Sequence, residues 1–579
     1  MPVINQDIAD IFNKLADLLD IQDENPFRIR AYRRAAQTIL NLSRKVTDMI
    51  AEGEDLTRLP GIGKELALKI DEIVRRGSLR KLNELEKEIP PELSDMMKLS
   101  DLGPKRVKII YKRLGIESIN ALEKAARQGK LQKLEGLGQK TEEKILQEIQ
   151  RWKERGEKKR FKLVHAEEIT GPLLDYLKQF KGVKEVEAAG SYRRHQETVG
   201  DMDILVTCQP GIRDKLMEHF ISYEDVDRVI SRGKTRSTVI LKNGLQVDLR
   251  AVAQDSYGAA LYYFTGSKAH NIKVRKMAAQ KNLKVNEYGV FKNDDKVAGK
   301  TEEEVFNIVG LNFILPELRE DRGEIEASLD NVLPHLVTVK DIKGDLQSHT
   351  TASDGRNSLK EMAAAARSKG YKYLAVTDHS KRVTVAHGLD EKRLREQLEE
   401  IDELNEQWKD FRVLKSSEVD ILKDGSLDLP NEVLKELDLV ICSVHYNSKL
   451  SRKEQTKRVL RAMENPYFHI MAHPTGRLIG KREAYDIDLE EIMKEAKENG
   501  CFFEINADPE RLDLSDIHAR LAKDMGIKIA ISTDAHTISG LDNMRFGVYQ
   551  ARRAWLEPED VLNTRSWNDL QKIIKHNKI

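Results

Sequence analysis

From about residue 340 onward, short apolar segments alternate with long charged ones, and this alternation constrains the fold more than any other feature of the sequence. The segments YLAVTDH and LVICSVH have the composition of buried strands, and DEKRLREQLEEIDELNEQW, which lies between them, has that of a long helix. Parallel strands need crossover helices, and about 240 residues of such alternation is the usual size of an α/β barrel. The sequence therefore predicts an α/β barrel over residues 339–579.

Five of the predicted strands end on residues of metal-binding types. In an α/β barrel the strand ends converge on one face, so these side chains could meet. Imidazole and carboxylate groups together suit Zn²⁺, Mn²⁺ or Fe²⁺ rather than Ca²⁺. For one strand alone, a buried histidine bonded to backbone is the commoner explanation, but five strands in register favour a metal cluster. The residues are His379, Glu418, His445, His473, Asp534 and His536.

The segment DLQSHTTASDG, residues 345–355, is either a polar turn or the first corner of this metal site. It holds His349 and Asp354, and Gln347 lies two residues before the histidine. Because the later strand ends supply partners for these side chains, we interpret the segment as part of the metal cluster.

The whole series resembles the PHP family, the polymerase and histidinol phosphatase domain, over residues 340–575. The resemblance implies a distorted (β/α)7 barrel that binds up to three metals, which we expect to be Mn²⁺ or Zn²⁺. It implies as ligands His349, Asp354, His379, Glu418, His445, His473, Asp534 and His536.

The chain departs from the commonest family pattern at Gln347, where that pattern has a histidine. A neutral amide oxygen is a weaker ligand for a transition metal than imidazole is, so we expect weaker binding of one metal. His387, in a loop, either contacts a substrate phosphate or only faces solvent, and Glu504 is expected to support the ligands.

Charge is distributed unevenly between the two parts of the chain. Residues 1–300 hold 56 Lys and Arg against 45 Asp and Glu, whereas residues 301–579 hold 41 against 51. A basic front half fits an anionic polymer as partner.

Three glycine turns repeat within the first 150 residues: LPGIGKELALKI, LSDLGPKRVKII and LEGLGQKTEEKIL. A glycine turn that opens a helix exposes backbone N–H groups to a phosphate, and the lysine that follows adds charge. The middle copy has Asp101 where the others have Gly61 and Gly136. A plain connection between helices is the alternative. The turns resemble helix-hairpin-helix motifs of DNA repair proteins, which implies DNA contacts at Gly61, Gly63, Lys64, Gly103, Lys105, Gly136, Gly138 and Lys140.

Three aspartates in the front half form a second candidate site. Asp201 and Asp203 are two apart in a strand pattern, so their carboxylates share one face, and Asp248 follows the Asn243-Gly244 hairpin turn on a strand that could pair alongside. Three close carboxylates repel one another unless cations lie between them. We therefore expect Mg²⁺ ions at this site, although a lone D-x-D is also common on surfaces.

The surrounding sequence, GSYRRHQETVGDMDIL followed by YYFTGSKAHNIKVRKMA, resembles the family X DNA polymerases over residues 1–315. The resemblance makes Asp201, Asp203 and Asp248 the catalytic metal ligands. It implies nucleotide binding by Gly190, Ser191, Arg194, Gly200, Tyr263, Phe264, Gly266, Ser267, Asn271 and Arg275. It also places Lys69 at the position of a Schiff-base nucleophile for deoxyribose phosphate, with a helix-surface lysine as the alternative.

The expected organisation is multidomain, with α+β and α/β parts. In chain order the domains are 1–90 helical with a helix-hairpin-helix, 91–155 a helical fingers-like domain, 156–254 a nucleotidyltransferase palm with a mixed sheet, 255–315 a small thumb, 316–338 a linker and 339–579 the PHP barrel.

Three cysteines without paired spacing indicate a reducing, cytoplasmic location, and neither a signal peptide nor an apolar run of roughly 20 residues is expected.

The order of the two halves resembles the bacterial and archaeal DNA polymerases X. We expect a monomer that fills short gaps in base excision repair with deoxynucleoside triphosphates. The resemblance also implies a Mn²⁺-dependent 3′-5′ exonuclease and cleavage at abasic sites. The alternatives are a polymerase with a purely structural PHP domain, a DNA-tethered phosphatase and a non-enzymatic scaffold.

Overall fold

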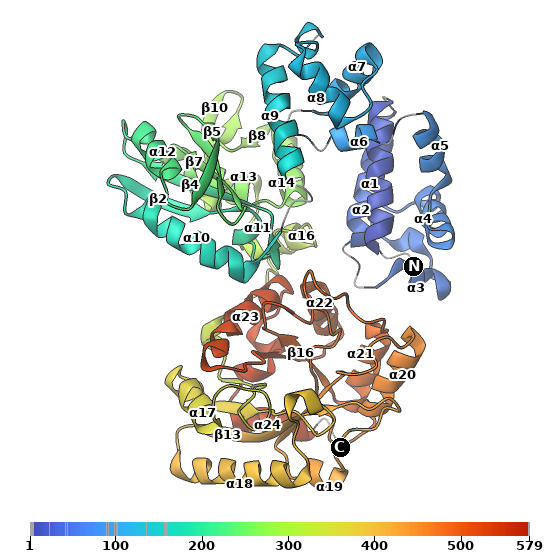
Figure 1. The fold of residues 1–579 in the computed structure, drawn as a ribbon, viewed down its shortest axis with the longest axis vertical. Coiled ribbons are helices and arrows are strands. Elements are labelled where there is room, and N and C mark those ends of the chain that lie inside the picture. The colour runs from blue at the N-terminus through green and yellow to red at the C-terminus, as the bar shows by residue number, and fades with distance from the viewer. Residues whose placement is uncertain are drawn as a thin grey trace. The chain divides into compact units, whose positions relative to one another are not determined.

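In a computed structural model the chain forms two compact units, Met1–Lys159 and Arg160–Ile579 (Figure 1). The structure describes residues 5–22, 24–40, 42, 44–88, 90, 92–97, 99, 102–134, 136–155 and 160–576. No helix within these residues is both long and apolar enough to span a bilayer.

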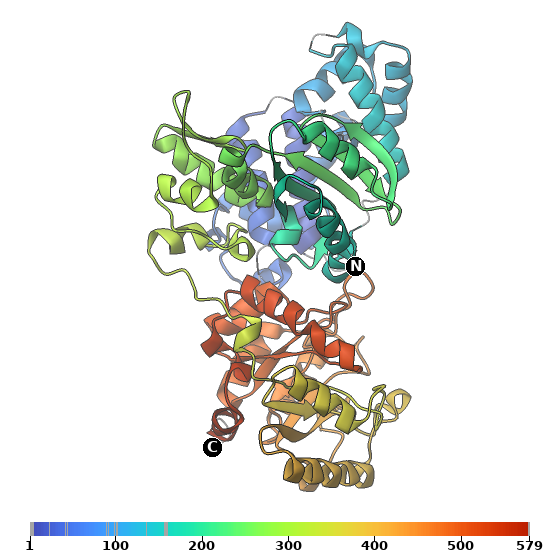
Figure 2. The same cartoon turned by 90° about the vertical axis from the view of Figure 1, so that its left-hand side faces the viewer.

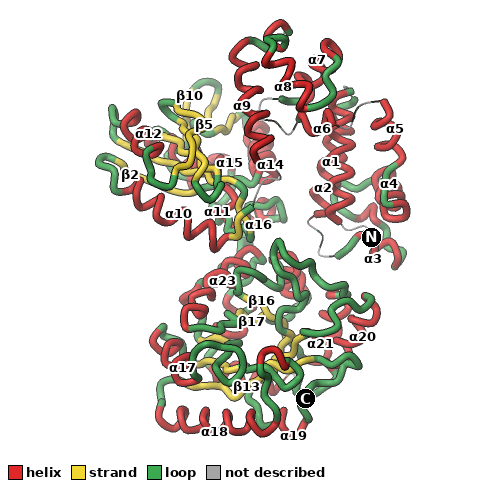
Figure 3. The backbone as a smooth tube through the Cα atoms, in the orientation of Figure 1, coloured by secondary structure: helices red, strands yellow, loops and turns green. Residues whose placement is uncertain are grey.

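The described part of the first unit is helical, as its colouring in Figure 3 shows. Helices α1 and α2 pack through the Phe12 and Tyr32 rings, whose centroids are 5.5 Å apart in an edge-to-face contact. The elements are α1 Asn5–Ile21, α2 Pro26–Leu40, α3 Val46–Ala51, η1 Leu56–Arg58, α4 Lys64–Arg76, α5 Arg80–Glu88, α6 Glu92–Met96, α7 Pro104–Leu114, α8 Ile119–Arg127, η2 Leu131–Lys133 and α9 Gln139–Arg155.

Within the described residues, the three glycine turns share one backbone hydrogen bond. In each, a leucine carbonyl accepts a hydrogen bond from the N–H three residues later, at 3.1 Å from Ile62, 3.2 Å from Leu102 and 3.1 Å from Leu137. Gly61 and Gly136 have φ of 77° and 75°, which a residue with a side chain rarely adopts. A helix follows each turn directly, so the three similar sequence segments form the same turn-helix arrangement.

The second unit begins with a five-stranded mixed sheet in the order β2-β4-β7-β6-β5. The Asn243-Gly244 turn joins β6 to β7 as an antiparallel pair, as the sequence predicts. The elements are β1 Phe161–Lys162, α10 Leu163–Lys178, β2 Val183–Ala188, α11 Gly190–Arg193, β3 Thr198–Val199, β4 Asp201–Cys208, α12 Arg213–Ile221, β5 Val226–Arg232, β6 Arg236–Leu241 and β7 Gln246–Ala251.

A smaller helical segment with a three-stranded sheet follows. Its elements are η3 Gln254–Ser256, α13 Tyr257–Thr265, α14 Lys268–Gln280, β8 Leu283–Asn286, β9 Gly289–Lys292, β10 Asp295–Ala298 and α15 Glu302–Val309. Residues 316–338, expected to be a linker, contain η4 Pro316–Leu318 and α16 Glu324–Leu329. Ile325 and Leu336 of this stretch are buried in the same core as α13 and α15, so the connection is packed and not loose.

Residues 344–532 form a nearly closed barrel of seven parallel strands in sequence order (Figures 1 and 2). A parallel bridge between Ser348 and Ala535 links the first strand to the last. The strands are β11 Gly344–Asp345, β12 Tyr373–Val376, β13 Arg412–Asp420, β14 Leu439–Ser443, β15 Ile470–Met471, β16 Phe502–Asn506 and β17 Ile529–Ser532.

Side chains alternate between the two faces of each barrel strand. Tyr373 and Ala375 of β12 fill the barrel interior, whereas Leu374 and Val376 pack beneath the outer helices. The helical elements of this part are η5 Val339–Asp341, α17 Leu359–Ser368, η6 Thr384–Ala386, α18 Glu391–Gln407, α19 Asn431–Leu434, α20 Arg452–Met463, α21 Leu489–Asn499, α22 Asp516–Asp524, η7 Ile538–Asn543, α23 Met544–Arg553, η8 Pro558–Asp560, η9 Leu562–Thr564 and α24 Trp567–His576. The predicted fold class, helical region, mixed-sheet palm and seven-stranded PHP-type barrel, is confirmed.

Candidate active sites

The three aspartates of the front half meet on two adjacent strands. β4 pairs parallel with β7, and Asp203 lies directly opposite Asp248, with Asp201 two residues earlier on β4. The Asp203 carboxylate accepts a bond from Arg250 Nε at 3.3 Å, and Asp248 accepts one from Arg236 Nη2 at 3.0 Å. Two guanidinium groups therefore offset part of the negative charge, and the sequence had given no sign of them.

Burial raises the pKa of Asp203 to about 6; Arg250 opposes this, and Asp248 and Asp201 add to it. A bound cation would offset this rise in the pKa, because it stabilises the ionised carboxylate. Three carboxylates without imidazole or thiolate form an oxygen donor set that suits Mg²⁺. Their donor chemistry thus suits divalent metal ions, but among the described residues these three carboxylates are not drawn together within 4.8 Å as the barrel ligands are.

The predicted phosphate turn lies beside these acids. The Ala189 N–H, next to Gly190 and Ser191, donates to the backbone oxygen of Asp203 at 2.7 Å. Arg194 Nε donates to Glu320 at 3.0 Å, and its Nη1 donates to the Thr265 carbonyl.

The predicted sugar-pocket residues surround that carbonyl. The Phe264 ring lies 4.2 Å below the Arg250 guanidinium, which ties it to the aspartates. A Cβ on Gly266 would make a tight 3.2 Å contact with Arg194 Nη1, and the φ of 71° at this position favours glycine. Ser267 caps α14 by accepting from the His270 N–H, and Asn271 donates to the Tyr263 carbonyl at 2.8 Å. Of the other predicted nucleotide-binding residues, Arg275 is exposed on α14, and Gly200 directly precedes β4.

In the first unit, Lys64 and Lys140 follow their glycine turns and are exposed, as a phosphate contact requires. Asp101 and the Lys105 side chain lie outside the described residues. Lys69 Nζ donates to Glu65 and lies 5.8 Å from the centre of the Tyr32 ring. The hydrogen bond from Lys69 lowers the pKa of Glu65. A nucleophilic role for Lys69 stays a prediction.

In the barrel, the eight predicted metal ligands come together at the carboxyl ends of the strands. Glu418, on β13, is fully buried at the centre and contacts four imidazoles. Its carboxylate oxygens lie 2.9 Å from His473, 3.2 Å from His379, 3.4 Å from His349 and 3.4 Å from His445. Because successive strands are parallel and in register, residues far apart in sequence end at one place.

Two further carboxylates complete the cluster. Asp534 lies 3.0 Å from His349, and Asp354 lies 3.4 Å from His536 and 3.6 Å from His379. Burial lowers the pKa of His379, but Glu418 and Asp354 outweigh it and raise that pKa to about 9. The carboxylates around the imidazoles carry negative charge that a bound cation would compensate.

Three groups of ligand atoms each fit within 4.8 Å: His349, Asp354, His379 and His536; His379, Glu418 and His445; and His349, Glu418 and Asp534. Among the described residues, His349 Nδ1, His473 Nδ1 and Gln347 Oε1 are buried without a hydrogen-bond partner. A buried polar atom left unpaired is costly, and a cation nearby satisfies it. The donor set therefore fits divalent metal ions.

Several supporting residues surround these ligands. Asp420 accepts from the His445 N–H at 3.0 Å and lies 3.3 Å from its Nδ1, which fixes the ring. Glu504 accepts from the His473 N–H at 2.8 Å. Arg511 Nε lies 4.0 Å from Asp534, close enough to meet a substrate phosphate. The sequence signal for Asp420 is its spacing of two from Glu418, which places both on one face of β13.

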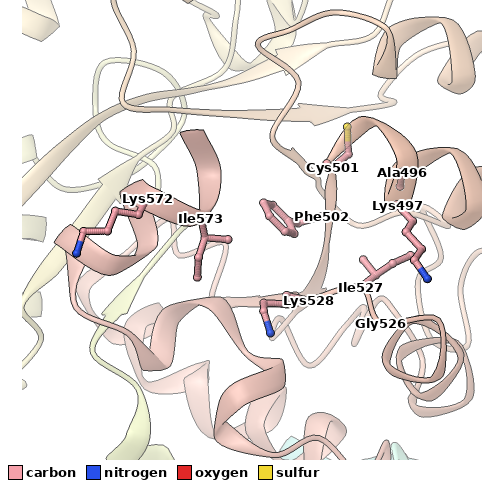
Figure 4. Close-up of a pocket in the computed structure, with 10 residues that line it drawn as sticks. Ala496, Lys497, Cys501, Phe502, Gly526, Ile527, Lys528, Lys572 and Ile573 are labelled. Atoms are coloured by element: carbon pink, nitrogen blue, oxygen red, sulfur yellow. The ribbon is translucent and has the colours of Figure 1, made fainter. Parts of the chain in front are cut away.

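Two other features lie apart from this cluster. His387 is exposed in the loop after β12. A hollow of about 460 Å³ lies at the amino-terminal ends of β16 and β17, next to Phe502 and Lys528 (Figure 4). The ammonium groups of its three labelled lysines point in different directions, so they do not converge on one ligand.

Family models cover most of the chain. They match a helix-hairpin-helix domain at residues 3–79, a SAM-like helix-hairpin-helix tandem at 93–151, a DNA polymerase beta palm at 165–260, a DNA polymerase beta thumb at 260–320 and a PHP domain at 345–508. The chain is 39% identical over 578 residues to the DNA polymerase/3′-5′ exonuclease PolX of Bacillus subtilis (strain 168), with 99% of each chain covered. This chain belongs to the PolX family. The family recognised from the sequence motifs is thus confirmed.

The barrel also resembles separate proteins. A probable phosphatase of Thermoanaerobacter sp. (strain X514) is 32% identical over 38% of this chain and 89% of its own length. A probable phosphatase of Caldanaerobacter subterraneus is 29% identical over 38% of this chain and 86% of its own length. The PHP part of this PolX chain is therefore related to proteins that consist of little else.

Proposed function

We propose that this chain is a DNA polymerase at the palm and a 3′-5′ exonuclease at the barrel. The observation that carries the proposal is that one PolX chain places three aspartates on two paired strands of the palm and a separate cluster of metal-binding side chains at the carboxyl ends of the barrel strands. Its DNA and deoxynucleoside triphosphate substrates follow from the polymerase domains.

At the palm, Asp201, Asp203 and Asp248 are the residues that would hold divalent cations. Such cations, when bound, activate the primer 3′-hydroxyl and neutralise the leaving pyrophosphate. Arg194 and the amides of Gly190 and Ser191 bind the triphosphate. The hydrogen bond from the Ala189 N–H to the backbone oxygen of Asp203 supports this assignment, because it joins the turn directly to the strand that carries the acids.

At the barrel, the eight clustered ligands would hold a metal cluster that, when bound, supplies hydroxide at neutral pH. Asp420 holds the His445 imidazole in place, and Glu504 holds the backbone of His473. Arg511 binds a phosphate of the scissile strand beside Asp534.

The finer assignments belong to the same proposal. We assign Mg²⁺ to the palm and Mn²⁺ or Zn²⁺ to the barrel. We assign a role in filling short gaps during base excision repair, with cleavage at abasic sites, to a cytoplasmic monomer. The exposed lysines at two glycine turns support a grip on the DNA backbone by the first unit, and Lys69 is the candidate lyase nucleophile.

A single incubation tests the two activities. A 5′-labelled primer–template is held with Mn²⁺, with and without deoxynucleoside triphosphates. Extension with nucleotides and shortening without them are expected. A product that never shortens would instead support the alternative in which the barrel is a metal-stabilised structural domain. That alternative has one observation in its favour, Gln347 in place of an imidazole.

A further inference from the structure

The phosphate turn of the palm, residues 190–197, contacts the outer helices of the barrel. The His195 ring stacks on Tyr549 of α23, with centroids 3.7 Å apart and planes 5° from parallel. Glu197 accepts a bond from Gln550 Nε2 at 3.0 Å and another from Arg477. The turn that is proposed to bind triphosphate is therefore packed against a different domain.

Arg553, the last residue of α23, is the centre of these contacts and is only 2% exposed. Its Nη1 donates to the backbone oxygen of Arg194 at 2.9 Å and to Glu320 at 3.0 Å. Its Nη2 donates to Asp516 of α22 at 2.7 Å, which holds the guanidinium from behind. One barrel side chain thus bonds both the phosphate turn and the segment between thumb and barrel.

Glu320 is shared between two guanidinium groups. Its Oε1 accepts from Arg194 Nε at 3.0 Å and from Arg553 Nη1 at 3.0 Å, and also from Gln196 Nε2. Arg194 Nη1 bonds the Thr265 carbonyl, so among the described residues these two bonds leave its Nη2 for a phosphate oxygen. The guanidinium of Arg194 is held in one orientation before any nucleotide arrives.

We propose that Arg553 is a positioning residue of the polymerase, through which the barrel sets the orientation of the triphosphate-binding Arg194. Arg553 touches neither nucleotide nor metal and acts through Glu320 and the Arg194 backbone. Without it, Glu320 keeps only Arg194 and Gln196 as hydrogen-bond donors among the described residues, and the turn loses the bond to the Arg194 carbonyl. Both changes cost affinity for the triphosphate, because the guanidinium must reorient when the nucleotide binds.

The test is steady-state primer extension by the full chain with Arg553→Met, at varied deoxynucleoside triphosphate. We expect KM for the nucleotide to rise about tenfold and kcat to change less than threefold. Arg553→Lys should recover part of the loss, since an ammonium can still reach one acceptor. Shortening of single-stranded DNA and the amount of bound metal should stay at wild-type values.

Arg545→Met is the matched control. Arg545 is on the same helix and bonds Glu167 of the palm at 3.2 Å and the Asp542 carbonyl at 2.8 Å, and neither acceptor belongs to residues 190–197. The Arg545→Met variant should leave KM for the nucleotide unchanged. An equal rise in both variants would mean that general docking of palm and barrel, and not Arg553, sets the affinity, and would overturn the inference.

Glu320→Gln provides a second variant if Arg553→Met fails to fold. It removes the same charged contact from a side chain outside the barrel, and we expect at least a threefold rise in KM. Unchanged KM in every folded variant of Arg553 and Glu320 would overturn the inference. Because the inference rests on the proposed role of Arg194, Arg194→Ala is measured in parallel. If Arg194→Ala itself leaves KM unchanged, the proposed function of the turn is what fails.

Discussion

Gln347 is the residue at which this chain departs from the PHP pattern, and the structure places it inside the cluster. Its side chain is fully buried, its Nε2 lies 3.4 Å from Asp534 Oδ1, and its Oε1 has no hydrogen-bond partner among the described residues. An unpaired oxygen at this place can serve as a weak ligand. The amide thus occupies a ligand position without the donor strength of an imidazole.

Gln347→His should strengthen metal binding. An imidazole at this position adds a nitrogen donor beside Asp534 and His349, and we expect the affinity for Mn²⁺ to rise about tenfold. Calorimetric titration of the metal-free protein with Mn²⁺ measures it, with Gln347→Asn as the control that keeps an amide. Loss of bound metal in Gln347→His would show that this corner of the site is misassigned.

The raised pKa of Asp203 predicts that metal binding at the palm depends on pH. Since this pKa is raised to about 6 in the metal-free protein, the carboxyl is protonated below that pH and must release a proton to bind Mg²⁺. We expect the apparent Kd for Mg²⁺ to rise about fivefold between pH 6 and pH 5, as measured by titration at each pH. A Kd that stays constant over that interval would contradict the account.

At the residue scale, sequence patterns predicted which ligands gather but not what surrounds them. The D-x-D spacing and the Asn243-Gly244 turn are local signals, so the approach of Asp248 to Asp203 could be foreseen. Arg250 and Arg236 pair with these acids only because β7 and β6 adjoin β4, and no local pattern marks them. Lys69 shows the reverse case, because the motif suggests a nucleophile where the structure places an ion pair with Glu65.

At the scale of elements, the glycine turns are the feature that sequence predicted best. Each consists of consecutive residues, so the hydrogen bond and the φ angles depend on local chemistry alone. The barrel strands were predictable for a similar reason, since each is a short apolar run that ends on a ligand. The packed helix α16 was not, because its burial depends on contacts with the thumb core.

A single lysine on a glycine turn tests whether these elements bind DNA. Lys140→Gln should weaken binding of gapped DNA roughly equally for all sequences and lower the slope of log affinity against log salt by about one. Fluorescence anisotropy over a salt series measures the slope. Lys124→Gln changes an exposed lysine on α8 that belongs to none of the three turns, and as the control it should change the slope less. Equal slopes for both variants would favour a plain helix connection.

At the scale of the whole chain, the second unit depends on ion pairs that join its domains. Glu317 lies before the barrel and accepts from Arg552 Nε of α23 at 2.7 Å. Burial raises the pKa of Glu317, but His195 and Arg552 outweigh it and lower that pKa to about 2. No sequence pattern marked these partners, since they come from three separate segments.

This pair predicts acid destabilisation of the second unit. The folded pKa of Glu317 lies below its unfolded value of 4.5, so the stabilisation is complete above pH 4.5 and is lost as pH falls toward 2. The free energy at stake is on the order of 2–3 kcal/mol. Glu317→Gln should lower Tm at pH 7 and narrow the difference in Tm between pH 7 and pH 4, as differential scanning fluorimetry would record. A variant with unchanged Tm at pH 7 would contradict this.

The central claim is that one chain holds two independent catalytic sites. The most direct measurement uses a 5′-labelled primer–template with Mn²⁺ and compares the wild type with Asp201→Ala and His379→Ala, with and without nucleotides. We predict that Asp201→Ala abolishes extension and keeps shortening, whereas His379→Ala abolishes shortening and keeps extension. Extension that survives Asp201→Ala, or shortening that survives His379→Ala, would contradict the account.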